Sequence, residues 1–323
     1  MAIERARAQA VQKPWGVADL RPWNRADQDG SRLVGEIWYE RPGTPALAPS
    51  LLLKLLFTSQ PLSIQVHPDD AYAQAMGLPR GKTEAWYILT AAPGAKVALG
   101  LKKRLAPRQL REAIEDGSIA GLVAWRTVLP GDVVFVPAGA IHAIGAGLVI
   151  AEIQQRSDAT FRMFDFGRKR ELHVANAVAV ADVVPAEIGV KPKRLTEERT
   201  LLASNPHFAF ERIELAPGST LRLEAERETW LLVVSGSGHA GKFDVATGDA
   251  VFAQSESVDI QAGLKGMASL VAYTGVSGPV PHLLQSLAQP SATDEARPEG
   301  MRVAAPFART KPAMAHGYMG AIQ

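Results

Sequence analysis

A chain of 323 residues with a formal net charge of +2 and 47% hydrophobic residues has the composition of an ordinary globular protein. The small net charge, without a dense Lys/Arg block, gives no electrostatic case for nucleic-acid binding. The lack of cysteine excludes disulfides and thiolate metal sites, and no apolar stretch reaches the roughly 18 residues of a membrane span. We therefore expect a cytoplasmic protein of one large or two ordinary domains.

The first part of the chain predicts strands separated by turns. Residues 1–12 are expected to be a frayed leader, and they lack the apolar core of a signal peptide. Residues 13–56 show short apolar runs punctuated by Gly and Pro, which favour strands. The run 51–57 reads as the most buried of these strands.

Two helices are predicted next. Asp69 or Asp70 is expected to cap a short helix that ends at Gly77. Pro107 has the place of a first helical residue, and the helix that follows it ends at Gly117. Strands are predicted to resume at 133–136, 148–154 and 160–166, and the Ala/Val-rich segment 173–184 fits a helix or a strand.

A weak internal repeat indicates two similar units. The run that starts with Glu84 and includes Trp86 resembles the run that starts with Glu228 and includes Trp230. Each is followed by a Gly-Asp turn and an apolar strand, and the first copy holds extra residues that accommodate the helix after Pro107. The sequence predicts a mainly β fold of two small β-barrels, the first with a helical insertion at about 102–125. The expected domains are 1–185, 186–286 and a C-terminal tail, 287–323.

The stretch 61–86 holds side chains that suit a metal. Gln65 and His67 lie two apart in a segment that reads as a strand, so both point to one face. Glu84 opens the next predicted strand. His67 alone would more often be an ordinary strand histidine, but a Gln, a His and a Glu aimed into one space resemble part of a metal site.

A further ligand candidate follows a turn rich in Gly and Pro. The spacing Gly131-x5-Pro137-x-Gly139-x2-His142 is similar to the second signature of the cupin barrels, in which the His is a metal ligand. The second copy of the repeat has Gln254 at the matching place, so we expect its barrel to be free of metal. Two His, one Glu and an amide suit catalytic zinc, and they are close to the two-His-one-carboxylate set of iron oxygenases; the neutral amide favours zinc.

Several motifs in order resemble those of type I mannose-6-phosphate isomerases in their short bacterial form, a family of the cupin superfamily. They are PLSIQVHP at 61–68, GKTEAW at 81–86, the turn before His142, and SDATFR at 157–162. The resemblance runs from about Lys13 to Tyr273. It implies a catalytic first domain that binds one Zn²⁺ per chain through Gln65, His67, Glu84 and His142.

The resemblance also implies which residues meet the substrate. Lys82, Arg162 and Glu152 fall on active-site positions of the family, and Ser63 is assigned to substrate binding. Lys82 and Arg162 would bind phosphate or stabilise an enediolate, whereas Glu152 is the preferred proton carrier, with a zinc-bound water as its rival. Longer members have a tyrosine where this chain has Ile144, so such a tyrosine takes no part in its chemistry.

Non-functional roles are the alternative for three of these residues. Lys82 would then be a plain surface residue, Glu152 would be bonded to Arg156, and Arg162 would pair with Asp158 or Asp165 in the barrel wall.

The expected function is zinc-dependent interconversion of mannose 6-phosphate and fructose 6-phosphate through an enediol. The expected partner is thus a small phosphosugar, without nucleic acid or membrane, and the sequence leaves the oligomeric state open. Two alternatives remain: a cupin iron oxygenase, and a cupin that binds a sugar phosphate without catalysis.

Overall fold

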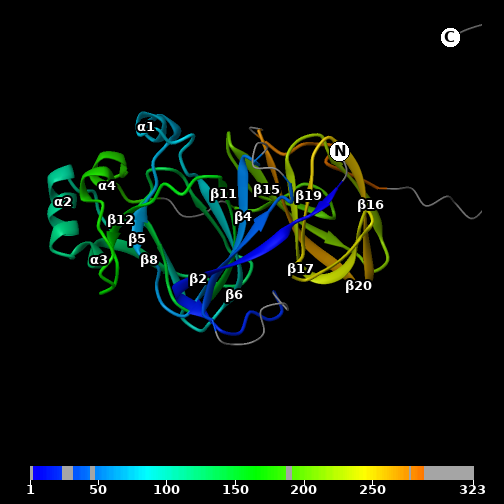
Figure 1. Cartoon of the computed structure of the whole chain (residues 1–323), viewed down its shortest axis with the longest axis horizontal. Coiled ribbons are helices and arrows are strands. Elements are labelled where there is room, and N and C mark those ends of the chain that lie inside the picture. Colours follow the sequence, from blue (N-terminus) through cyan, green and yellow to red (C-terminus); the bar gives the residue numbers. More distant parts are fainter. Residues whose placement is uncertain (1–2, 24–31, 44–47, 187–190, 276–277, 287–323) are drawn as a thin grey trace, which may run out of the picture. The chain divides into compact units, whose positions relative to one another are not determined.

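The computed structural model describes residues 3–23, 32–43, 48–186, 191–275 and 278–286. Strands dominate these residues, and every pairing between them is antiparallel (Figure 1). The predicted mainly β fold is confirmed. The predicted tail, 287–323, lies outside the described residues.

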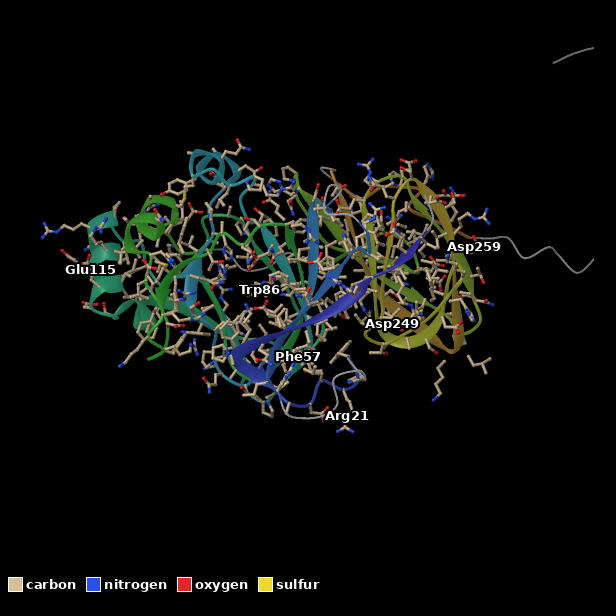
Figure 2. All side chains as sticks on the ribbon, viewed as in Figure 1. Arg21, Phe57, Trp86, Glu115, Asp249 and Asp259 are labelled. Atoms are coloured by element: carbon tan, nitrogen blue, oxygen red, sulfur yellow. The ribbon has the colours of Figure 1, made fainter. Side chains whose placement is uncertain are left out.

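The first β-unit consists of a six-stranded and a five-stranded sheet that face each other across a core containing Trp86, Ile88, Val97 and Ile144 (Figure 2). In spatial order, the six-stranded sheet contains β2 (Arg7–Val17), β3 (Val34–Glu40), β4 (Leu51–Thr58), β11 (Leu148–Gln155), β6 (Glu84–Ala91) and β9 (Val133–Val136). The five-stranded sheet contains β12 (Phe161–Phe164), β5 (Ile64–Val66), β10 (His142–Ile144), β7 (Lys96–Leu101) and β8 (Val123–Thr127).

Helices cover the outer face of the five-stranded sheet (Figure 1). Ile64 and Val66 of β5 pack there with Leu110 and Ile114 from the predicted insertion. The ambiguous segment 173–184 contains a helix. The helices are α1 (Asp70–Ala75), which Asp69 caps, α2 (Pro107–Glu115), α3 (Ile119–Leu122) and α4 (Val174–Val180). Among the described residues, none of these helices has the length and apolarity needed to cross a membrane.

The second β-unit is a ten-stranded sheet that encloses its own core, which includes Leu231, Val251 and Tyr273. Along its main path the sheet contains β1 (Glu4–Arg5), β19 (Ala250–Ala253), β17 (Thr229–Ala240), β20 (Glu256–Thr274), β15 (Phe208–Leu215), β14 (Arg199–Ser204) and β13 (Lys193–Arg194). Beside this path lie β16 (Thr220–Ala225), β18 (Phe243–Ala246) and β21 (Leu284–Ser286). The proposed domain division near residue 185 precedes β13 and stays a prediction.

The two β-units pack face to face through the six-stranded sheet. Leu53, Leu55 and Phe57 of β4 share a core with Trp230 and Phe252 of the second β-unit. The opposite face of β4 looks into the first β-unit. Because both faces are covered, β4 is apolar at nearly every position instead of alternating, which explains why 51–57 reads as the most buried strand.

The prediction of a frayed leader at residues 1–12 is wrong for the described part of that segment. Glu4 pairs with Phe252 in β19, and β2 pairs along β3, so the N-terminal segment contributes a strand to each β-unit. Sheet pairing satisfies backbone N–H and C=O groups whatever the side chains are. The side chains of β2 range from exposed to buried without a regular alternation, so they gave no apolar pattern to recognise.

The internal repeat exists, but its sequence alignment is shifted by one residue. In both copies the glycine of the Gly-Asp turn donates its N–H to the neighbouring strand, Gly131 to Ile88 O and Gly248 to Val233 O. Ile88 lies two residues after Trp86, whereas Val233 lies three residues after the second tryptophan. The structural equivalent of Trp86 is therefore Leu231, the residue after Trp230 in β17.

This one-residue shift turns the two tryptophans to different faces. Trp86 lies inside the first β-unit, whereas Trp230 lies in the core between the two β-units. Neighbouring side chains in a strand point to opposite faces, so a slip of one residue reverses the direction of every side chain. Glu228, two residues before Trp230, likewise faces the first β-unit and does not correspond to Glu84.

Candidate metal and substrate site

A pocket of about 340 Å³ opens between the two sheets of the first β-unit. Polar side chains from both sheets reach it because they occupy alternate positions whose neighbours point outward. Most of the predicted site residues line it. The lining comprises Lys13, Trp15, Glu36, Trp38, Lys54, Leu56, Leu62, Ser63, Gln65, Lys82, Glu84, Trp86, His142, Ile144, Glu152, Ser157, Asp158, Thr160, Arg162 and Arg170.

The five-stranded sheet presents a row of three polar residues to the pocket. Gln65 in β5, which lies between β10 and β12, is opposite His142 of β10 on one side and Arg162 of β12 on the other. Its neighbours Ile64 and Val66 point to the helices on the other face. Strand pairing therefore brings together residues that are far apart in the sequence.

The six-stranded sheet presents the facing row. Glu152 of β11 lies opposite Lys54 of β4 on one side and Trp86 of β6 on the other. Two residues further along β11, Gln154 lies opposite Glu84 of β6. Each sheet thus contributes part of the site, and the space between the sheets is where the parts meet.

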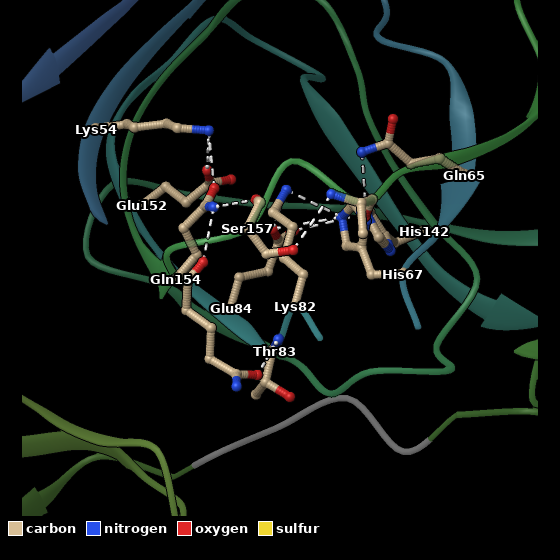
Figure 3. A network of polar contacts seen from close by, with 12 residues as sticks. Lys54, Gln65, His67, Lys82, Thr83, Glu84, His142, Glu152, Gln154 and Ser157 are labelled. Atoms are coloured by element: carbon tan, nitrogen blue, oxygen red, sulfur yellow. Dashed lines mark hydrogen bonds and ion pairs between the residues drawn. The ribbon is translucent and has the colours of Figure 1, made fainter. Parts of the chain in front are cut away.

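His67, Glu84 and His142 form a buried cluster whose ligand atoms all lie within 4.8 Å of one another (Figure 3). Glu84 Oε2 lies 3.5 Å from His67 Nε2, and Glu84 Oε1 lies 3.5 Å from His142 Nε2. Ligand atoms about 2.0–2.1 Å from a tetrahedral zinc are themselves about 3.4 Å apart. The three side chains therefore fit one metal ion.

Both histidines are held with the lone pair of Nε2 directed into the cluster. His67 Nδ1 lies 2.8 Å from Ala159 O, and His142 Nδ1 lies 2.9 Å from Ala140 O. A carbonyl only accepts hydrogen bonds, so each Nδ1 carries the proton and each Nε2 keeps its lone pair. Burial, with help from the charge of Lys82, lowers the pKa of His67 to about 3, and burial also lowers the pKa of His142. Both rings are neutral at pH 7, as metal ligands must be.

Gln65 lies beside this cluster with its amide nitrogen toward it. Gln65 Nε2 is 3.2 Å from His142 Nε2, and Gln65 Oε1 accepts a 2.9 Å hydrogen bond from Ser63 Oγ. A half-turn of the amide would bring Oε1 to the place of Nε2, facing the cluster, and leave Nε2 to donate to Ser63, since a hydroxyl also accepts hydrogen bonds. Ser63 thus orients Gln65 as well as lining the pocket.

Lys82 joins the cluster as a cation. Its Nζ lies 2.8 Å from Glu84 Oε2 and 3.1 Å from His67 Nε2, and the side chain is buried. Burial alone would lower the pKa of Lys82, but the charges of Glu84 and Glu152 outweigh it and raise the pKa. Glu84 shows the converse: burial opposes ionisation, yet the charge of Lys82 holds the pKa of Glu84 well below the ordinary value. Lys82 is therefore a positive charge beside His67 and Glu84.

Glu152 is buried in the pocket wall and is not bonded to Arg156, the partner that a structural role would require. Its Oε2 accepts a 3.1 Å hydrogen bond from Trp86 Nε1, and its Oε1 lies 3.5 Å from Lys54 Nζ. Arg156 pairs instead with Glu40, at 3.0 Å. Burial and the nearby charge of Glu84 raise the pKa of Glu152, and Lys82 and Lys54 only partly offset them. Glu152 holds a proton more readily than an ordinary glutamate does.

Among the described residues, Arg162 forms no ion pair with Asp158 or Asp165, the partners that a structural role would require. Asp165 is held by Arg168 and Arg170, at 2.9 Å and 2.5 Å. Arg162 Nη1 donates to Glu171 O at 2.7 Å, which steadies the guanidinium, while the side chain lines the pocket. Burial and the charge of Arg170 lower the pKa of Arg162. A bound anion would therefore relieve the local excess of positive charge.

Sequence reasoning missed several residues that line the pocket, among them Lys13, Trp38, Lys54 and Arg170. One of them left a signal. Lys54 is a lysine in the middle of an apolar run, and a buried lysine needs a partner. The structure supplies Gln154 Oε1 at 2.8 Å, together with Glu152 and the face of Trp38.

Comparisons with known proteins agree on one kind of enzyme. No protein-family model matches the chain. A mannose-6-phosphate isomerase of Streptococcus mutans is 36% identical over 200 residues, which cover 58% of this chain and 61% of that protein. The mannose-6-phosphate isomerase ManA of Bacillus subtilis is 34% identical over 200 residues, with 58% and 62% covered. The aligned part of the chain thus spans about three fifths of these curated relatives.

Solved structures extend the likeness beyond the aligned residues. The crystal structure of the mannose 6-phosphate isomerase from Bacillus subtilis has a TM-score of 0.72 at 25% identity, covering 84% of this chain and 100% of that one. The apo form of the mannose 6-phosphate isomerase from Salmonella typhimurium, at 15% identity, shares the fold with a TM-score of 0.69 and covers 85% and 100%. The chain is therefore similar to mannose-6-phosphate isomerases in sequence and in fold.

Proposed function

We propose that the chain is a zinc-dependent mannose-6-phosphate isomerase that interconverts mannose 6-phosphate and fructose 6-phosphate. The observation that supports this most is the meeting of three kinds of group in one buried pocket: a His–Glu–His metal cluster, the cations Lys82 and Arg162, and the carboxyl group of Glu152. Aldose–ketose interconversion needs a proton carrier, stabilisation of a developing oxyanion and a grip on phosphate, and this pocket offers all three.

His67, Glu84 and His142 would hold the zinc ion, with Gln65 as a fourth ligand after its amide turns. The donor set fits because both Nε2 atoms are unprotonated and the carboxylate of Glu84 lies at 3.5 Å from each. Bound zinc would supply a Lewis acid that stabilises negative charge on substrate oxygens. The absence of thiolates argues against soft metals, and the neutral amide of Gln65 favours zinc over iron.

Glu152 is the group we assign to proton transfer between C1 and C2 of the sugar. Trp86 holds its Oε2, so Oε1 is the atom that takes and returns the proton. The raised pKa of Glu152 lies closer to neutral pH than that of an ordinary glutamate, so its carboxyl group is better suited both to accept and to donate a proton. The proton leaves C2 of the aldose to form an enediol and returns to C1 to give the ketose.

Lys82 and Arg162 would stabilise the negative charges of the substrate. Lys82 lies among the metal ligands, so its ammonium suits an oxygen near the reacting carbons. Arg162 lies on the opposite sheet, next to Arg170, where two guanidinium groups suit the phosphate. Ser63 would contribute to the same pocket.

A coupled assay with mannose 6-phosphate, run before and after chelation and again after zinc is restored, tests this function. We expect turnover that chelation abolishes and zinc restores. Zinc-loaded protein without turnover would refute the proposal. Binding of the sugar phosphate without turnover would instead indicate a non-catalytic cupin, and iron-dependent oxygen consumption would indicate an oxygenase.

A variant pair links turnover to the cluster. His142→Ala should lose both zinc and turnover, because it removes a buried ligand. His239→Ala is the matched control, since this histidine lies in the second β-unit with its side chain 56% exposed, and it should retain both. The cytoplasmic location and the metal-free second barrel stay predictions.

A further inference from the structure

The carboxylate of Glu228 lies in the second β-unit but holds the backbone of the first. The side chain is buried, and its Oε2 accepts a 2.6 Å hydrogen bond from Ser50 N while Oε1 accepts a 2.8 Å bond from Leu51 N. The indole of Trp230 donates to Oε1 at 3.1 Å. Three donors thus fix this carboxylate, and two of them are the amides at the start of β4.

Ser50, which Glu228 holds through its backbone N–H, is also hydrogen-bonded to two loops of the pocket. Its carbonyl oxygen accepts hydrogen bonds from Arg80 Nη1 at 2.9 Å and from Arg156 N at 2.8 Å. The two loops are joined to each other, because Ser157 Oγ donates to Arg80 O at 3.0 Å. Fixing Ser50 therefore fixes both loops.

Each loop carries a group that the metal site needs. The loop that contains Arg80 leads within two residues to Lys82, which lies 3.1 Å from His67 Nε2. The loop that contains Ser157 leads within two residues to Ala159, whose carbonyl oxygen holds His67 Nδ1 at 2.8 Å. Both paths from Ser50 thus end at His67.

We infer that Glu228 is a positioning residue for the metal site: through Ser50 and Arg80 it sets the loops that carry Lys82 and the carbonyl group that orients His67. The second β-unit then acts on the site through this hydrogen-bonded connection as well as through apolar packing. The inference rests on the proposed metal site, and it assigns the second β-unit a role in metal affinity.

Metal affinity is the first measurement. Zn²⁺ affinity is determined by competition with a chromophoric chelator, at a temperature where circular dichroism shows each variant folded. Glu228→Ala should weaken zinc binding about tenfold, the lower end for groups that orient metal ligands indirectly. Arg80→Ala should weaken it to a similar degree. The double variant should weaken it by less than the sum of the two single effects, because both changes break the path through Ser50 and Arg80.

Glu211→Gln is the control for general damage to the second β-unit. Glu211 is also buried there, but it bonds to Arg199 and Tyr273, within the same β-unit. This variant should lower the thermal unfolding temperature without changing zinc affinity. A loss of affinity equal to that of Glu228→Ala would overturn the inference, as would full additivity of the Glu228→Ala and Arg80→Ala effects.

Hydrogen exchange gives a readout that needs neither metal nor sugar. Lys82 N donates to Pro68 O at 3.0 Å, and Thr83 N donates to Gln155 Oε1 at 2.9 Å. Both amides should exchange faster in Glu228→Ala than in the wild type or in Glu211→Gln. Unchanged exchange would overturn the inference.

Arg80→Ala and the wild type provide two further checks on the role of Glu228. If Glu228→Ala does not fold, Arg80→Ala alone tests the same connection, and wild-type zinc affinity in that variant would overturn it. If the wild type binds zinc but shows no isomerase turnover, the proposed function fails while the affinity and exchange results still decide the role of Glu228.

Discussion

Lys82 Nζ lies 2.8 Å from Glu84 Oε2 in a buried part of the pocket, so the proposed substrate contact and a proposed metal ligand share one ion pair. Removing one member of a buried ion pair costs about 3–5 kcal/mol, because the remaining charge is left without a partner. A dication beside Glu84 would supply that missing partner. Loss of Lys82 should therefore reduce the stability of the metal-free protein more than that of the metal-loaded protein.

We expect Lys82→Met to lower the thermal unfolding temperature of the metal-free protein and to increase the stabilisation that added zinc produces. Turnover should fall at least about 100-fold, as it does when a group that stabilises transition-state charge is removed. Thermal unfolding followed by circular dichroism, with and without zinc, measures the first effect. Lys103→Met, at an exposed position, should match the wild type. A zinc-induced shift no larger than that of the wild type would contradict the ion-pair argument.

Arg162→Ala should bind zinc as the wild type does and lose most turnover, because Arg162 lines the pocket without belonging to the metal cluster. We expect kcat/KM to fall by about 100-fold or more. Arg162→Lys should recover only part of it, since an ammonium lacks the fork that binds phosphate through two bonds. The exposed Arg126→Ala is the control. Near-normal turnover in Arg162→Ala would remove this residue from the site.

The pH profile of kcat/KM should report Glu152. Burial and the charge of Glu84 raise the pKa of Glu152 above its ordinary value of 4.5, so activity should fall on acidification at a higher pH than an ordinary glutamate would give. Lys54→Met removes a charge that opposes this shift, and the acid limb should therefore move to still higher pH. Glu152→Gln should be nearly inactive at every pH. A limb that stays in place in Lys54→Met would exclude Glu152 as its origin.

The metal-free protein should lose stability on acidification below about pH 6.5. Burial lowers the pKa of His67 to about 3, so between pH 6.5 and 3 the unfolded chain holds a proton on this ring that the folded chain does not. Stability then falls as the pH falls through that window, by at most about 1.4 kcal/mol per pH unit for this one group. Urea unfolding at pH 7 and pH 5 measures the loss.

The matched pair for this test is His67→Gln and His239→Gln. His67→Gln removes the titrating ring and should lose less stability between pH 7 and pH 5 than the wild type. His239→Gln changes an exposed histidine and should keep the dependence of the wild type. Equal losses in His67→Gln and the wild type would show that other groups cause the dependence.

Gly81→Ala should loosen the metal site, because a Cβ at residue 81 would lie 2.4 Å from the carbonyl carbon of Asp69 and 2.5 Å from Pro68 O. Both contacts are backbone atoms directly after His67, and they cannot yield without moving it. We expect a stability loss of about 1–3 kcal/mol and weaker zinc binding. In Gly121→Ala of α3 the Cβ would meet nothing within 4 Å, so this control should be neutral or stabilising. Unchanged zinc affinity in Gly81→Ala would refute the expectation.

Strand residues were predicted well where side chains alternate between two environments. Gln65 lies between two residues that face the helices, and Glu84 and Trp86 share the inner face of β6, as their spacing requires. The helix after Pro107 was equally clear, since its first residue and its terminating glycine are local signals. These features depend on neighbours in the sequence, which a sequence shows directly.

Predictions failed where strand pairing between distant segments decided the structure. The strands at the N-terminus form because β3 and β19 offer unpaired edges, and their own side chains give no sign of it. The repeat was misaligned by one residue because two tryptophans look equivalent in sequence, although they face different cores. Only hydrogen-bond register distinguishes these cases.

The stretch 61–86 by itself determined which residue types gather at the site, because Gln65 lies in β5, His67 follows directly after that strand, and Glu84 opens β6. The tertiary structure decided what surrounds them: that Lys82 points at Glu84, that Glu152 rests against Trp86 rather than Arg156, and that Glu228 holds the loops from the neighbouring β-unit. Local periodicity sets the face to which a side chain points. The partner it meets there depends on which distant strands pair, and that is a property of the whole fold.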